Sequence, residues 1–264
     1  MYSKKELLDG LATSILGRKI FVFEKIDSTN VCAKVLADVD MEEGTVVIAE
    51  YQTSGHGRLG RSWLSEAGKN LLFSIIIRPA VEQKRAGLLT FFAAAGTALG
   101  IESVLGCRIE CKWPNDLLLH EKKCCGILLE SSSTSRRLDY AVIGIGLNVN
   151  QAKFEPGLKR TATSLRLESG KTIDRKKLFQ HILQNLDGLY SKVKEGDFNR
   201  VKQEWLSRTS MIGKVVTVEH EKFATRGIVH SINDDGGVVL KTSTGLQTFF
   251  AGDVTLRQLK KAKP

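Results

Sequence analysis

The chain has 264 residues, of which 42% are hydrophobic and 26% are charged, and its formal net charge is +10. Length and composition fit one large globular domain, or a large domain with a small appendage. The positive charge is compatible with a nucleic-acid binder, with an enzyme that handles anionic nucleotides, and with a solvated lysine-rich surface. Composition therefore indicates a globular protein and leaves three interpretations of the charge open.

The N-terminal stretch is polar and amphipathic, so we expect no signal peptide, and no apolar run is expected to approach the length that crosses a bilayer. No C-x-x-C pair and no histidine pair at zinc spacing accompanies the cysteines, which we expect to be buried, reduced thiols. They are Cys32, Cys107, Cys111, Cys124 and Cys125. These features predict a cytoplasmic protein with no membrane partner.

Periodicity predicts alternating strands and helices along most of the chain. The expected helices cover residues 4–16, 31–38, 83–105, 174–194 and 198–209, and the expected strands cover 19–25, 45–51, 70–77, 108–112, 117–119, 124–131 and 137–148. The long helix 83–105 carries alanine and glycine suited to close packing on a sheet. Residues 151–164 lack periodicity and are expected to form a mobile loop.

The composition changes near Gly213. Short alternating runs between residues 214 and 256 are separated by turns, which predicts a small all-β module of about five strands. We therefore expect two domains, 1–212 and 213–264. Only one short helix fits before the first strand, so there is no room for a helix-turn-helix, and we expect no specific DNA binding.

The most unusual stretch alternates glycines with basic residues and ends in a tryptophan. It contains Gly55, His56, Gly57, Arg58, Gly60, Arg61 and Trp63. Glycine allows close approach of a ligand, and arginine presents donors that suit carboxylate or phosphate. The G-x-G-x-x-G spacing matches a dinucleotide motif, but no convincing helix follows it. The stretch is thus either an anion-binding loop or a long hairpin with solvated arginines.

Further polar groups and glycines recur at the ends of the expected strands. Residues 112–116 join a cation, a proline turn, an amide and a carboxylate, and Gly126 interrupts a strand, as expected where a ligand approaches. Residues 27–30 lead into a helix, with Ser28 or Thr29 as the N-cap, and capping alone would explain them. Together the groups outline a site that could join a carboxylate to a nucleotide phosphate.

These motifs resemble those of the biotin–protein ligases over nearly the whole chain, from about Arg18 to Leu256. The matching blocks are Asp27-Ser28-Thr29-Asn30, Gln52-x-x-Gly55-His56-Gly57-Arg58-x-Gly60-Arg61-x-Trp63, Lys112-Trp113-Pro114-Asn115-Asp116, Lys123-x-x-Gly126, Gly144-x-Gly146-x-Asn148 and Ala162-Thr163-Ser164-Leu165. The resemblance implies an α/β (α+β) fold, with a mixed-sheet catalytic domain and a small Src-homology-3-like C-terminal barrel. It indicates the monofunctional type, which lacks an N-terminal DNA-binding domain.

The resemblance also implies a reaction. Biotin and MgATP would give biotinyl-5′-adenylate and pyrophosphate, and a lysine of the biotin carboxyl-carrier protein would then attack the adenylate and release AMP. Mg²⁺ would arrive on the ATP phosphates, and its protein ligands are not specified. Some family members dimerise through the catalytic sheet, so the resemblance leaves a homodimer open.

Site residues follow from the resemblance, position by position. The catalytic residues would be Lys123 and Arg58, with Asp116 as the candidate that orients or deprotonates the acceptor lysine. The biotin-binding residues would be Ser28, Thr29, Asn30, Gln52, Gly55, His56, Gly57, Arg58, Lys123, Gly126, Gly144 and Gly146. The ATP or adenylate would contact Arg58, Arg61, Trp63, Lys112, Asn115 and Asn148. Phe154 is expected either to stack on adenine or to pack on the core.

One departure and three rival functions accompany this interpretation. The family loop most often reads Gly-Arg-Gly-Arg, whereas this chain has His56 at the second position. The rivals are a lipoate- or octanoyl-transferring enzyme, a basic nucleic-acid-binding regulator and a biotin sensor without catalytic activity. The glycine–arginine loop and the motif at 112–116 argue against the first rival, and the missing reader helices argue against the second.

Overall fold

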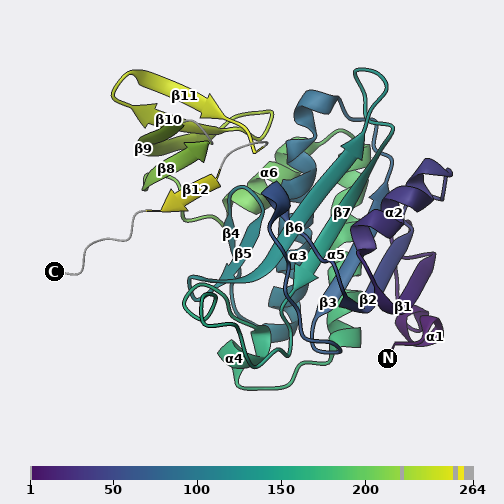
Figure 1. Ribbon diagram of the computed structural model, residues 1–264. Coiled ribbons are helices and arrows are strands. Elements are labelled where there is room, and N and C mark those ends of the chain that lie inside the picture. The colour runs from purple at the N-terminus through teal and green to yellow at the C-terminus, as the bar shows by residue number, and fades with distance from the viewer. Residues whose placement is uncertain (1, 221–222, 252–254, 259–264) are drawn as a thin grey trace.

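The computed structural model describes residues 2–220, 223–251 and 255–258. A seven-stranded mixed sheet forms its centre, in the order β1-β2-β3-β7-β6-β5-β4. Only β1 and β2 run parallel, and the other neighbouring strands are antiparallel. Helices α3, α5 and α6 lie on one face of the sheet and α2 lies on the other (Figure 1). The mixed α/β fold expected from the sequence is confirmed.

The elements agree with the expected strands and long helices to within a few residues. The strands of the large sheet are β1 (Ile20–Ile26), β2 (Val46–Gln52), β3 (Leu71–Ile77), β4 (Glu110–Lys112), β5 (Asp116–Leu119), β6 (Lys122–Ser132) and β7 (Tyr140–Leu147). The helices are α1 (Lys4–Leu8), α2 (Thr29–Asp38), α3 (Gly87–Leu105), α4 (Leu165–Ser169), α5 (Arg175–Lys194) and α6 (Phe198–Leu206). Two 3-10 turns, η1 (Arg58–Gly60) and η2 (Gln83–Arg85), precede β3 and α3.

Two expectations about helices need correction. The first helix ends at Leu8 rather than near residue 16 because Gly10 turns the chain with φ +80°. The Asp187 carboxylate of α5 then accepts hydrogen bonds from the backbone N–H groups of residues 14–16 at 2.6–2.9 Å. Helix α4 was not expected, although Ser164 caps it in the standard way by accepting from Leu167 N.

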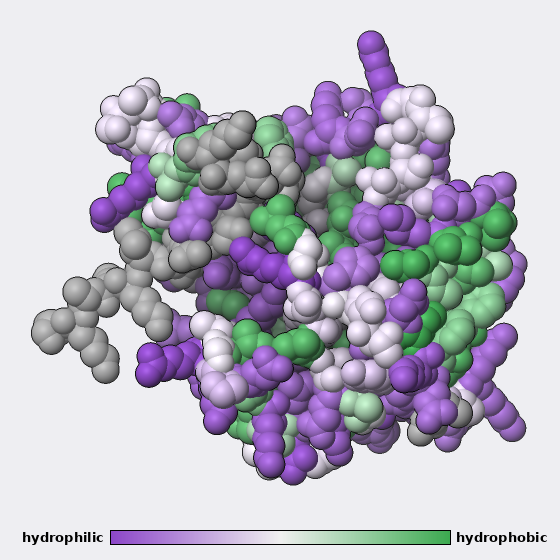
Figure 2. Space-filling view, in the orientation of Figure 1, coloured by the Kyte–Doolittle hydropathy of each residue, from purple (hydrophilic) through white to green (hydrophobic). Residues whose placement is uncertain are grey.

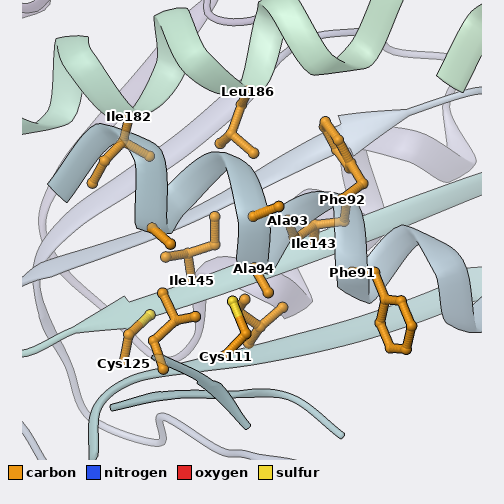
Figure 3. Close-up of a cluster of buried hydrophobic side chains, with 14 of the residues drawn as sticks. Phe91, Phe92, Ala93, Ala94, Cys111, Cys125, Ile143, Ile145, Ile182 and Leu186 are labelled. Carbon is orange, nitrogen blue, oxygen red and sulfur yellow. The ribbon is translucent and has the colours of Figure 1, made fainter. Parts of the chain in front are cut away.

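The glycines of α3 pack on a helix rather than on the sheet, which corrects the expectation for residues 83–105. A Cβ added to Gly96 would lie 2.5 Å from Leu186, and one added to Gly100 would lie 2.5 Å from the Cα of Ile182. Figure 3 shows Ile182 and Leu186 pointing from α5 toward α3, beneath which lie Cys111 and Cys125. Glycine therefore lets two helices approach closely, while larger residues of α3 fill the space above the strands.

The statement that no segment approaches membrane-spanning length is wrong for residues 83–105. This segment has a mean hydropathy of 1.7 over 18 residues, and by length and composition alone it could cross a membrane. In the structure, 67% of that window is buried inside the protein, between the sheet and α5. Its apolar character is therefore accounted for by its place in the core.

The C-terminal module is a five-stranded antiparallel sheet, in the order β11-β10-β9-β8-β12, which confirms the expected strand number. Its strands are β8 (Val215–His220), β9 (Phe223–Ile232), β10 (Val238–Thr242), β11 (Gly245–Phe249) and β12 (Thr255–Gln258). The indole Nε1 of the buried Trp113 donates to the Gly236 carbonyl at 3.2 Å and joins the module to the rest of the molecule. Residues 221–222, 252–254 and 259–264 of the expected domain lie outside the described residues, and the division at 212/213 stays a prediction.

All five cysteines are free thiols. Cys111, Cys124 and Cys125 are buried, as expected, while Cys32 and Cys107 are half-buried. Burial raises the pKa of the Cys124 thiol to about 12. At neutral pH this thiol is therefore protonated and unreactive, as expected of a core residue.

Candidate active site

The glycine–arginine loop (residues 53–66) leaves β2 and folds back on itself. Gly57 N donates to Arg61 O at 2.7 Å, and Trp63 N donates to Gly55 O at 2.8 Å, so the loop closes as an irregular hairpin. At its tip Leu59 takes a left-handed conformation with φ 56°, an unfavourable one for leucine. The hairpin returns Trp63 to the sheet instead of leaving it in solvent.

Two paired glycines form a flat floor under that tryptophan. Gly126 on β6 and Gly146 on β7 are direct neighbours in the ladder. A Cβ on Gly146 would lie 2.6 Å from Trp63 Cε2, and a Cβ on Gly126 would lie 2.9 Å from Trp63 Cζ3. Any side chain at either position would displace the indole. The glycine inside β6 therefore allows the Trp63 indole to approach closely, while the expected approach of a ligand at Gly126 stays a prediction.

Lys123 lies beside this floor. Its Nζ is 2.6 Å from Asp116 Oδ1 and 5.4 Å from the centre of the Trp63 ring. The contact with Asp116 is an ion pair by distance, although its angles do not make it a hydrogen bond. Register places Asp116 beside Gly126 on one side and Lys112 on the other, so one row across β4, β5, β6 and β7 carries a cation, a carboxylate and the glycine floor.

The backbone of Lys123 also holds the end of the loop formed by residues 151–163. Lys123 N donates to Thr161 O at 2.8 Å, and Thr163 N donates to Lys123 O at 2.9 Å. Thr163 O accepts from Asn148 Nδ2 at 3.1 Å, whereas Asn148 Oδ1 is buried with no hydrogen-bond partner in the described residues. This oxygen is therefore an unused acceptor next to the Lys123 backbone contacts.

A chain of hydrogen bonds lies at the other end of the floor. Gln52 Oε1 accepts from Thr29 N at 2.7 Å and from Thr29 Oγ1 at 2.9 Å. Ser74 Oγ lies 2.8 Å from Thr29 Oγ1 and 2.6 Å from Asn30 Oδ1, and its single proton can go to either. Ser28 caps α2 through its contact with Val31 N. Capping therefore accounts for Ser28, while Thr29 and Asn30 belong to the buried chain.

Arg58 of the loop is half-buried, and its two terminal nitrogens contact different parts of the molecule. Arg58 NH1 donates to Asn115 Oδ1 at 3.4 Å, and Arg58 NH2 donates to the carbonyl of Ala251 in the C-terminal module. Asn115 is itself held by its Nδ2 bond to Ile127 O at 2.6 Å. Arg61 follows the tip and is exposed. Through Asn115, Arg58 is thus tied to the row that contains Asp116.

A cleft of about 590 Å³ opens between the glycine–arginine loop and residues 151–158. Gln52, Gly55 and Trp63 line one wall, and Phe154 and Leu158 line the other. A cleft of about 370 Å³ near α6 and the β9–β10 turn contains none of the predicted site residues. The larger cleft therefore adjoins the site indicated by the motifs and shares Gln52, Gly55 and Trp63 with it, whereas Lys123 and Asp116 do not line it.

Three polar residues of the site were missed by sequence reasoning: Ser74, Glu130 and Glu168. Glu130 of β6 accepts from Asn30 Nδ2 at 2.9 Å. Glu168 accepts from Thr163 Oγ1 at 2.6 Å and contacts His120 Nδ1 at 2.6 Å, so it fixes the end of the 151–163 loop. The charged residue that ends the apolar run 127–129 was a signal that could have drawn attention to Glu130.

Comparison with known proteins agrees with this geometry. Residues 22–148 match the model of the biotin/lipoate A/B protein ligase family. A bifunctional ligase/repressor BirA from Bacillus spizizenii is 36% identical over 96% of this chain and 79% of its own length. A biotin–[acetyl-CoA-carboxylase] ligase from Paracoccus denitrificans is 30% identical over 87% of this chain and 97% of its own length. The chain therefore belongs to the biotin/lipoate A/B protein ligase family.

A solved structure supports the same assignment. The biotin protein ligase from Aquifex aeolicus in complex with biotin and ATP superposes with a TM-score of 0.79 at 29% identity, covering 92% of this chain and all of that one. The fold and the family define an enzyme of the ligase class.

Proposed function

We propose that this protein is a biotin–protein ligase that activates biotin as biotinyl-5′-AMP and transfers it to a lysine of a biotin carboxyl-carrier protein. One observation carries the proposal. Lys123 and Trp63 lie over the floor formed by Gly126 and Gly146, next to the hydrogen-bond chain that begins at Gln52. This strip of the sheet, which we call the slot, has a cation at one end and amide and hydroxyl groups at the other, and would suit a ligand with a carboxylate tail and a polar ring.

In the first step, a biotin carboxylate oxygen attacks the α-phosphorus of ATP. An O–P bond forms, the bond from the α-phosphorus to the bridging oxygen breaks, and pyrophosphate leaves. Both reactants are anions, so Lys123 and Arg58 would act by bringing them together and by stabilising the negative charge that develops on the phosphate oxygens. Lys112 in the same row would contribute to binding the departing phosphates.

The polar ring of biotin would lie at the other end of the slot. Gln52 Oε1 already accepts two hydrogen bonds from Thr29, so the Nε2 amide of Gln52 remains as the donor for a ligand. A buried ureido group must find hydrogen-bond partners, because leaving such groups unpaired is costly. The Trp63 indole would cover the ring system and exclude water.

In the second step, the acceptor lysine amine attacks the carbonyl carbon of the adenylate. A C–N bond forms, the C–O bond to the phosphate breaks, AMP leaves, and the amine loses a proton. Asp116 is our candidate for orienting or deprotonating that amine. Its 2.6 Å contact with Lys123 gives it a further role in holding the Lys123 ammonium beside the floor.

The residues present fit a magnesium ion carried in by ATP. Asn148 Oδ1 is a buried oxygen without a hydrogen-bond partner in the described part of the chain, and oxygen atoms are the ligands that Mg²⁺ prefers. It would hold the ion directly or through water, whereas Asp116 Oδ1 is already paired with the Lys123 ammonium at 2.6 Å. A bound Mg²⁺ would neutralise phosphate charge.

A reconstituted reaction tests the proposal. The purified protein is incubated with biotin, MgATP and a biotin carboxyl-carrier domain, and the acceptor mass and pyrophosphate release are measured. We expect a biotinylated acceptor, and biotin-dependent pyrophosphate release even without acceptor. Lipoate in place of biotin is the control, and faster turnover with lipoate would contradict the proposal. Biotin binding without turnover would instead identify a sensor.

A further inference from the structure

We infer that Glu130 is a positioning residue for the Gln52 end of the slot, where the polar ring of biotin would bind. The Glu130 carboxylate holds Asn30 on one side and, through His56, the glycine–arginine loop on the other. This inference rests on the proposed function, because it assigns a role to Glu130 in biotin binding. Glu130 touches neither the glycine floor nor Lys123 in any contact of the described residues, so it would act through its neighbours.

Glu130 connects three elements. Its Oε1 accepts from Lys34 Nζ of α2 at 3.0 Å, and its Oε2 accepts from Asn30 Nδ2 at 2.9 Å. The same Oε2 lies 3.9 Å from His56 Nε2 of the glycine–arginine loop. Only 27% of the Glu130 side chain is exposed, so these contacts are partly shielded from water. A carboxylate on β6 thus joins the start of α2 to the loop.

The buried side chain of Asn30 requires a hydrogen-bond partner for its Nδ2 group. It is 4% exposed, and its Oδ1 would be 2.1 Å from a Cβ at Gly144, so it fills the space above β7 that this glycine leaves. With Nδ2 bound to Glu130, Oδ1 faces the Ser74 hydroxyl at 2.6 Å. Without the carboxylate, the amide loses the partner that fixes its orientation, and a buried N–H₂ group is left unpaired.

Asn30 is connected to the proposed biotin-binding amide of Gln52 through Ser74 and Thr29. Ser74 Oγ lies within hydrogen-bond distance of both Asn30 Oδ1 and Thr29 Oγ1, and the Thr29 hydroxyl in turn donates to Gln52 Oε1. That bond, together with the one from Thr29 N, holds the Gln52 amide with Nε2 toward Gly55. A continuous chain of hydrogen-bond contacts therefore runs from Glu130 through Asn30, Ser74 and Thr29 to the Gln52 amide that we propose as a donor to biotin.

His56 links the Glu130 carboxylate to the glycine–arginine loop. The ring is oriented by the 3.4 Å contact of Nδ1 with the Ser54 carbonyl, which leaves Nε2 toward Glu130. The histidine that departs from the usual family pattern is thus paired with a residue that the motifs do not include. The contact is longer than that of Asn30, so we expect it to contribute less.

Calorimetry of biotin binding, with Michaelis constants from pyrophosphate release, tests the inference. We expect Glu130→Gln to weaken biotin binding about tenfold and to leave the Michaelis constant for ATP within about twofold. Glu130→Asp should recover part of the affinity, and His56→Gln should weaken binding about threefold. The matched control is Glu43→Gln, because Glu43 also accepts from a lysine and a buried side chain, at 2.7 Å from Lys194, but far from the cleft. It should lower the melting temperature and leave biotin affinity unchanged.

Unchanged biotin affinity in a folded Glu130→Gln variant would overturn the inference. An equal loss of ATP affinity would overturn it too, because that pattern indicates general damage. If Glu130→Gln does not fold, the biotin affinities of Glu130→Asp and His56→Gln test the inference in its place. Unchanged biotin affinity in both of these variants would then overturn it. A parent protein that binds biotin without turnover contradicts the ligase proposal alone, since the calorimetry still tests Glu130. A parent that binds no biotin contradicts both.

Discussion

The Lys123 ammonium lies 2.6 Å from the Asp116 carboxylate, although the two residues are seven positions apart in the chain with a turn between them. The β5–β6 hairpin brings them together, and a register shift near Leu117 and Leu118 lets Lys123 reach the row that contains Asp116 and Gly126. The cation assigned to the reacting carboxylate is therefore held beside the floor by a paired charge before any substrate binds. Such preorganisation is what makes an electrostatic contribution effective.

Lys123→Ala should slow biotin-dependent pyrophosphate release by about 100-fold or more, because it removes a charge aimed at both reacting anions. The measurement is single-turnover release of pyrophosphate from ATP. Lys122→Ala is the neighbouring control, since Lys122 is 44% exposed and lies 3.8 Å from Glu168. Near-normal release from Lys123→Ala would show that the role given to Lys123 is wrong.

Arg58→Gly should weaken binding of the adenylate, because the Arg58 guanidinium contacts Asn115, next to Asp116, and is there placed to bind an anion. We expect more free biotinyl-5′-AMP in solution, and biotin attached to bystander proteins. Chromatography of the reaction mixture measures the free adenylate. If leakage does not increase, Arg58 does not hold the intermediate.

Gly146→Ala should weaken biotin binding and lower stability by about 1–3 kcal/mol, because the new methyl group would lie 2.6 Å from Trp63 Cε2. Calorimetry with biotin and urea unfolding measure the two effects. Gly188→Ala is the control, since nothing lies within 4 Å of a Cβ there and alanine favours the helix α5. Equal biotin affinities for the two variants would argue against a floor beneath the indole.

Gly100→Ala should destabilise the protein by about 2–3 kcal/mol, because its Cβ would meet the backbone of Ile182 at 2.5 Å and neither helix can shift without disturbing the core. Urea unfolding measures the loss. The loss should greatly exceed any effect of Gly188→Ala on the exposed part of α5. A change below about 0.5 kcal/mol would mean that the two helices are less closely packed than described.

Acid should destabilise the protein partly through Glu43. Burial acts to raise the pKa of this carboxyl, but hydrogen bonds from Lys194, Tyr190 and the Arg78 N–H outweigh it and lower the pKa below its ordinary value. A lowered pKa stabilises the fold above the unfolded value of about 4.3, and that stability is lost as the pH falls. Melting temperatures from pH 7 to pH 3 should therefore fall more steeply for the parent than for Glu43→Gln, which should be less stable at pH 7.

Much of the fold could be predicted from the sequence because its signals are local. The strands β3 and β7 are buried on both faces and are therefore continuous apolar runs. Helix α5 is buried on one face and therefore has an amphipathic pattern. The side on which α3 presents its glycines could not be predicted. Gly96 and Gly100 fit a sheet or a helix equally well, and only the position of α5 decides between them.

The sequence by itself determined the family and the residue types of the site, because the motifs around Trp63, Asp116 and Lys123 are specific in order and spacing. Tertiary structure alone decided which of those residues meet. The glycine–arginine loop, expected to surround an anion, also lays its tryptophan on two paired glycines, and its His56 faces a glutamate 74 positions further along the chain. The physical reason is that register and packing between distant strands set such contacts, and neither is encoded in any local stretch.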